Sequence, residues 1–182
     1  MSALRKGLAK VEVALKWDPS PAGAPPHDLD IVAAVYEADD RPGATAGAVG
    51  SAPAYLVHFG KRSPDGTITL NRDSRTGQGF GFDEVMTLEL DRMSERLRRV
   101  VVGVVLQDTG AARTFGDVPG TVVRIREGWT DLVEDDFSAV AGASAATVAE
   151  FVRGTGGGWS LRPAVHGFTA GPEEFARLLG AV

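Results

Sequence analysis

The stretch KVEVALKW, residues 10–17, alternates strictly between apolar side chains and polar or small ones. One side of the stretch carries only apolar side chains, those of Val11, Val13, Leu15 and Trp17. Successive side chains of a strand point to opposite faces of a sheet, so this period of two predicts a β-strand with one buried face. Because aromatic side chains are usually buried, Trp17 is expected to belong to the core.

Six further stretches rich in β-branched residues follow, and glycine and proline separate them. They are residues 30–38, 54–59, 84–90, 99–107, 120–125 and 147–152. The clearest turn between them is SPDG, residues 63–66, in which the proline presets the second turn position and Asp-Gly favours the reversal. Regularly spaced short strands of this kind predict an all-β protein, a β-sandwich of two mainly antiparallel sheets. The length of 182 residues suggests a single domain over residues 1–182.

One helix is predicted near the C-terminus, at GPEEFARLLG, residues 171–180. Pro172 stands at its start, and two glutamates follow in the first turn, where negative charge is favourable. Its apolar stripe is expected to pack on the sandwich and consists of Phe175, Leu178 and Leu179. The glycine-rich GTGGGW, residues 154–159, is interpreted as a hairpin turn. Two loops rich in proline, glycine and alanine, residues 19–27 and 39–53, are interpreted as surface excursions.

The composition excludes several classes of function. The net charge is −5, whereas a nucleic-acid-binding surface normally shows a basic excess. Cysteine is absent, so there are no disulfides, no thiolate zinc site and no cysteine nucleophile. The sequence contains no Gly-x-Ser-x-Gly motif, which argues against a serine hydrolase. No apolar run suits a signal peptide or a membrane span, so we expect a cytoplasmic protein without direct membrane insertion.

Two groups of acidic side chains are candidates for a shared cation site. Asp28 and Asp30 lie two residues apart in HDLDI, and residues two apart in a strand point the same way. Asp73, Asp83 and Glu84 belong to the glycine-rich stretch LNRDSRTGQGFGFDEV, residues 70–85. If this loop lies beside the start of the strand at 30–38, five carboxylates converge and repel one another unless a cation neutralises them.

Calcium suits such a cluster, because it takes six to eight oxygen ligands in irregular geometry. The twelve positions from Asp73 to Glu84 match an EF-hand loop only superficially, since Gln78 stands at the position of its required glycine and the flanks are strands. The alternative interpretation is a loop of acidic side chains that are simply solvated. From these residues alone, both interpretations stay open.

Several motifs, in this order, resemble the TerD family of tellurite-resistance and stress proteins. They are KWD (16–18), HDLDI (27–31), SPDG (63–66), RDSRTGQGFGFDE (72–84), TFGDV (114–118) and the closing stretch 159–182. The resemblance implies a β-sandwich whose acidic loops bind Ca²⁺ and for which no enzymatic activity is established. It also implies stress-response partners, including TerB-like or membrane-associated Ter proteins. The metal ligands that it implies are Asp28, Asp30, Asp73, Ser74, Thr76, Asp83 and Glu84.

The chain departs from the family pattern within its loops. Phe80 and Phe82 stand where the family has aspartates, so the resemblance implies at most one well-formed Ca²⁺ site, with an affinity near the weak end, about 10⁻⁵–10⁻³ M. Strand alternation points both phenylalanines the same way, either into the core or out as an adhesive pair. Phe59 and Gly60 replace a frequent Asn pair. The family's opening segment is missing, so an exposed edge strand is expected to favour homo-oligomers.

Two functional hypotheses follow. The first is a non-enzymatic calcium-binding stress-response module in which the cation fixes acidic loops that present a partner-binding surface. The second is a protein-interaction sandwich of the same family that has lost strong Ca²⁺ binding, and the two phenylalanines favour it. An enzyme would require a pocket with a perturbed acid–base pair, whereas metal binding explains the clustered carboxylates better.

Overall fold

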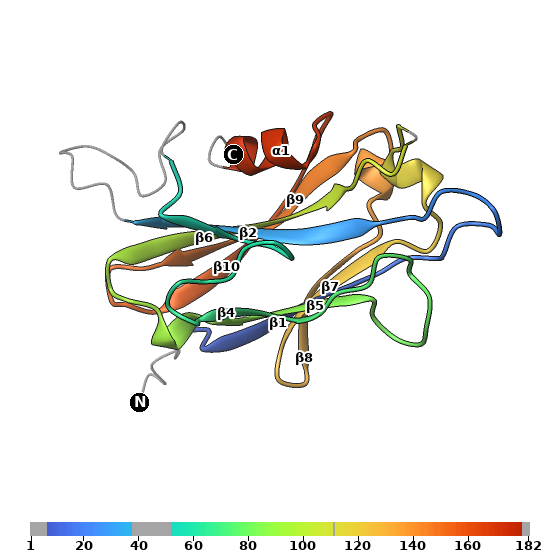
Figure 1. Ribbon diagram of the computed structural model, residues 1–182. Helices are drawn as coiled ribbons and strands as arrows, with labels where there is room; N and C mark the ends of the chain where they lie inside the picture. The colour runs from blue at the N-terminus through green and yellow to red at the C-terminus, as the bar shows by residue number, and fades with distance from the viewer. Residues whose placement is uncertain (1–6, 38–51, 111, 180–182) are drawn as a thin grey trace.

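The protein folds as two antiparallel five-stranded sheets with one short α-helix near the C-terminus (Figure 1). This computed structural model describes residues 7–37, 52–110 and 112–179. The prediction of an all-β sandwich with a C-terminal helix is confirmed. The predicted loop at residues 39–53 lies outside the described residues except for its last two positions.

The first sheet has the strand order β4-β5-β1-β7-β8. Its strands are β4 (Ile68–Arg72), β5 (Glu84–Glu89), β1 (Lys10–Lys16), β7 (Val122–Glu127) and β8 (Thr130–Asp135). The second sheet has the order β10-β9-β6-β2-β3. Its strands are β10 (Trp159–Phe168), β9 (Ala145–Arg153), β6 (Leu97–Leu106), β2 (Leu29–Glu37) and β3 (Tyr55–Val57). All seven predicted strands overlap observed ones. Three single 3₁₀ turns lie between strands, at Leu90–Arg92, Phe115–Asp117 and Ser138–Val140.

The main core fills the space between the two sheets. The predicted inner face of β1 is buried, since Val11, Val13 and Leu15 are 0% exposed. Trp17, which follows β1, is 3% exposed, and the prediction that it belongs to the core is confirmed. The alternation of residues 10–17 therefore reflects a strand that packs one face against the core.

A second, smaller apolar cluster lies on the outer face of the second sheet, under helix α1 (Pro172–Leu178) (Figure 1). Phe175 is fully buried there, together with Leu179 directly after the helix. Gly103 of β6 makes room for this contact, because a Cβ at Gly103 would lie 2.4 Å from Cζ of Phe175. The predicted helix and its docking are confirmed, although Leu178 is only partly buried. No helix among the described residues is long and apolar enough to cross a membrane.

Both short turns predicted from glycine and proline are present. In SPDG the amide of Gly66 donates to the carbonyl of Ser63 at 3.4 Å, and in GTGGGW the amide of Gly154 donates to the carbonyl of Gly158 at 2.8 Å. The loops of residues 17–28, 73–83 and 107–121 gather at one end of the sandwich, on the right in Figure 1. The acidic residues of the motifs HDLDI and RDSRTGQGFGFDE lie at this loop end.

Candidate metal centre

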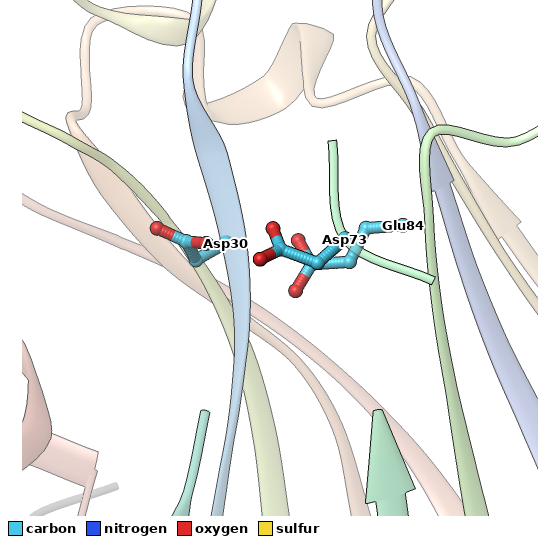
Figure 2. Close-up of side chains that lie close together, drawn as sticks. All are labelled: Asp30, Asp73 and Glu84. Atoms are coloured by element: carbon cyan, nitrogen blue, oxygen red, sulfur yellow. The ribbon is translucent and has the colours of Figure 1, made fainter. Parts of the chain in front are cut away.

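Three carboxylates from three separate segments meet near the loop end. Asp30 comes from β2, Asp73 follows β4, and Glu84 begins β5 (Figure 2). One oxygen from each lies within 4.8 Å of the others. Glu84 pairs with Leu15 in the sheet, so its side chain shares the inward face of that leucine. Its Oε2 accepts a hydrogen bond from the amide of Ile31 at 3.1 Å, and this bond links the two sheets.

The surroundings of the cluster disfavour the charged form of its buried carboxylates. The pKa of Glu84 is raised to about 10, chiefly by burial and then by the neighbouring Asp30. The pKa of Asp30 is raised to about 7, chiefly by burial and also by Asp28 and Asp73, although the hydrogen bond from Gln107 opposes the shift. Among the described residues, Glu84 Oε1 and Asp28 Oδ1 are buried without a hydrogen-bond partner. A hard cation would supply the missing counter-charge to these oxygens.

A cavity of about 180 Å³ opens onto the cluster, and Asp28, Asp30 and Asp73 line it. Arg75 and Phe59 complete its rim, together with Gln107. The Gln107 side-chain amide donates to Asp30 Oδ2, and its backbone amide donates to the carbonyl of Asp28 at 2.8 Å. Gln107 thus holds both aspartates of HDLDI in place and leaves Asp30 Oδ1 available for a ligand.

Three residues of the predicted ligand set bond to the backbone instead. Asp83 Oδ2 accepts from the amide of Trp17 at 2.9 Å. Ser74 Oγ accepts from the amide of Gly77 at 3.2 Å, and Thr76 Oγ1 accepts from the amide of Gln78 at 3.4 Å. The structure therefore brings Asp28, Asp30, Asp73 and Glu84 together, whereas these three side chains shape the loop.

Comparison with known proteins matches residues 1–178 to the TerD domain model. The chain belongs to the TerD family. It is 26% identical over 174 residues to tellurium resistance protein TerD of Serratia marcescens, covering 94% of this chain and 87% of that one. General stress protein 16U of Bacillus subtilis (strain 168) is 25% identical over 173 residues, covering 93% and 86%. A solved homologue of telluride resistance protein (TerD) from Streptomyces coelicolor A3(2) superposes with a TM-score of 0.89 at 52% identity, covering 97% and 99%.

The two phenylalanines that distinguish this TerD-family loop lie outside the core. Phe80 is 99% exposed. Phe82 is half-buried, with Cζ of Arg124 4.4 Å from its ring centroid and Nζ of Lys16 at 6.0 Å. The structure thus excludes the core alternative, and it does not pair the rings either, because Phe82 is covered by cationic side chains while Phe80 faces solvent.

Sequence reasoning missed the residues that hold the TerD-family loop in position. Trp17 Nε1 donates to the carbonyl of His27 at 2.8 Å, and His27 Nδ1 lies 2.9 Å from the carbonyl of Asp18. Gly77 packs against the same indole with a positive φ of 66°. A Cβ at Gly77 would lie 2.6 Å from Trp17 Cδ1. Trp17 therefore connects the loop before β2 with the loop after β4.

Gly77→Ala should lower the free energy of unfolding by about 2 kcal/mol, because it combines left-handed strain with contact against the indole. It should also weaken any cation binding by displacing Asp73. Gly81→Ala is the matched control: φ is 84° there, but nothing lies within 4 Å of the added Cβ. The control should cost only about 1 kcal/mol of strain. Urea denaturation of both variants measures the difference, and equal losses would contradict the packing role of Gly77.

Proposed function

We propose that this TerD-family protein is a non-enzymatic, calcium-binding stress-response module. Its cation ligands would be Asp30, Asp73 and Glu84, with Asp28 beside them. The observation that carries the proposal is Glu84, a fully buried carboxylate that has one unpartnered oxygen and an oxygen within 4.8 Å of two further carboxylates. A buried carboxylate without a counter-charge is costly, and a cation removes that cost.

The donor set fits calcium, because all of the side chains are hard carboxylate ligands. Asp30 and Glu84 lie at the starts of strands, whereas Asp73 lies in a loop. This arrangement gives an irregular geometry of the kind that Ca²⁺ tolerates. Mg²⁺ demands near-ideal octahedral geometry and should bind less well. When bound, Ca²⁺ would supply positive charge to the cluster. The ligands themselves would then hold β2, β5 and the loop after β4 together and fix the loop end as a surface for other stress-response proteins, TerB-like or membrane-associated Ter proteins among them.

Calorimetric titration of chelator-treated protein tests the proposal. We expect one Ca²⁺ per chain with a dissociation constant of about 10⁻⁵–10⁻³ M and weaker binding of Mg²⁺. Saturation at 100 times the dissociation constant should stabilise the fold by about 2.7 kcal/mol. No heat of binding and no calcium-dependent change in melting temperature would overturn the proposal.

Asp73→Asn should weaken Ca²⁺ binding at least about tenfold, because calcium affinity follows the number of charged ligands. Asp73 is exposed, so the stability of the calcium-free protein should stay nearly unchanged. Asp91→Asn, an exposed carboxylate outside the cluster, is the matched control. Titrations of both variants decide the matter, and equal affinities in the two would remove Asp73 from the ligand set.

The second candidate function is an interaction module that binds partners without strong calcium binding. The full exposure of Phe80, at a position where the family has an aspartate, favours it. The same titration separates the two functions, because this module would show no calcium binding in the range of about 10⁻⁵–10⁻³ M.

A further inference from the structure

A fully exposed tryptophan lies at the turn between β7 and β8, far in sequence from the acidic cluster. Trp129 is 96% exposed, whereas Trp17 and Trp159 are each 3% exposed. The hairpin that carries it projects from the first sheet, away from the second sheet (Figure 1). Within the described part of the chain, the Trp129 indole N–H donates no hydrogen bond, and Cζ of Arg126 lies 5.9 Å from the centroid of its ring.

A hollow of about 450 Å³ lies directly beside this tryptophan, on the solvent-facing side of the first sheet. Arg126, Glu127 and Gly128 of the hairpin form one wall of the hollow, and Ala9 and residues of β1 and β5 form the rest. The base of the hairpin is fixed, since Glu127 Oε1 accepts from the amide of Ala9 at 2.8 Å. Nε of Arg126 also lies 3.4 Å from Glu12 Oε1.

We propose that two copies of this chain associate through this face, with Trp129 of each copy seated in the hollow of the other. An interface with two-fold symmetry uses the same patch on both copies, so it must contain both the projecting group and its receptor. Trp129 and the hollow meet that condition because they are neighbours on one surface. A partner that only received Trp129 would leave the adjoining hollow empty, whereas a second copy uses both features.

The charges around the hollow also match a second copy. Lys10 and Arg126 supply two positive charges, and Glu12 and Glu127 supply two negative ones. Under two-fold symmetry, the basic side chains of such a patch can lie opposite the acidic side chains of the other copy. The carboxylates in the hollow also offer acceptors to the indole N–H of the incoming Trp129. Tryptophan is enriched among the residues that contribute most to the binding energy of interfaces, and its N–H usually finds a partner when it is buried.

Sedimentation equilibrium over a range of protein concentrations tests the proposal, and calcium is not required. The wild type should shift with concentration from the chain mass of 19.1 kDa toward twice that mass. Trp129→Ala should weaken self-association at least about tenfold. Phe80→Ala is the matched control, since Phe80 is 99% exposed on another loop, and it should associate as the wild type does.

A second variant tests whether the contact is made in the hollow itself. Thr87→Arg keeps Trp129 but puts a long charged side chain into the hollow, which Thr87 lines, and it should weaken association as strongly as Trp129→Ala. Because the other two tryptophans are buried, a red shift of wild-type emission on dilution reports the release of Trp129. A wild type that stays at the chain mass at every concentration would overturn the proposal. Full association of the Thr87→Arg variant would also overturn it.

Discussion

Glu84→Gln should stabilise the calcium-free protein and abolish its response to calcium. The pKa of Glu84 is raised from 4.5 to about 10, so the folded state holds a proton that the unfolded state loses above pH 4.5. This difference opposes folding increasingly as the pH rises from 4.5 toward 10, and at pH 7 it amounts to about 3 kcal/mol as an upper limit. Glutamine keeps the shape and the bond from the Ile31 amide without that loss.

Urea denaturation with chelator at pH 5 and at pH 8 measures this effect. In chelator, the free energy of unfolding of the variant should exceed that of the wild type only slightly at pH 5 and considerably more at pH 8. Millimolar Ca²⁺ should stabilise only the wild type and so make it the more stable of the two. Glu134→Gln, on exposed β8, is the control and should change neither quantity. A variant that is less stable than the wild type in chelator at pH 8 would show that the Glu84 carboxylate is not under electrostatic stress.

Gly103→Ala should destabilise the fold by about 3 kcal/mol, although it adds a single methyl group. The new Cβ would lie 2.4 Å from Phe175 Cζ and 2.9 Å from the Ala146 carbonyl oxygen. Rotation of Phe175 relieves only the first contact, because the second is with backbone. The backbones of β6 and β9 must therefore shift locally, and the new methyl group also displaces Phe175 from its place against β6, so part of the area that Phe175 buries is lost.

Gly142→Ala is the matched control for this substitution. Nothing lies within 4 Å of its added Cβ, and φ is not positive there. We expect it to stay within about 0.5 kcal/mol of the wild type in the same urea denaturation. A Gly103→Ala variant as stable as this control would contradict close packing of α1 on β6.

The buried strands could be predicted from the sequence because each is strongly apolar, either on one face or along its whole length. Strands β4, β8 and β10 were missed for the opposite reason. All three lie at sheet edges, and their only buried residues are Ile68 of β4 and Trp159 of β10, so none has a clear apolar period. Edge strands obtain their conformation from one neighbour, and pairing of this kind is set by tertiary contacts rather than by local sequence.

The residues of the candidate site were also predictable only in part. Their spacing in a strand predicts that Asp28 and Asp30 point the same way, and in the structure both line the same cavity. Asp83 and Glu84 were assigned together because both match the family loop, but adjacent residues of a strand face opposite ways, and only Glu84 reaches the cluster. Gln107 was missed because its contact with Asp30 depends on the register of β2 against β6, which pairs Asp30 with Val105.

The central place of β1 in its sheet has a consequence during synthesis. Strand β1 pairs with β5 on one side and β7 on the other, so it stays without its second partner until residues 122–127 have emerged from the ribosome. At about 5–20 residues per second, this interval lasts several seconds. Throughout it, Val11, Val13 and Leu15 stand on an unprotected strand. The segment that begins the core is therefore the one that a nascent-chain chaperone has the longest opportunity to bind.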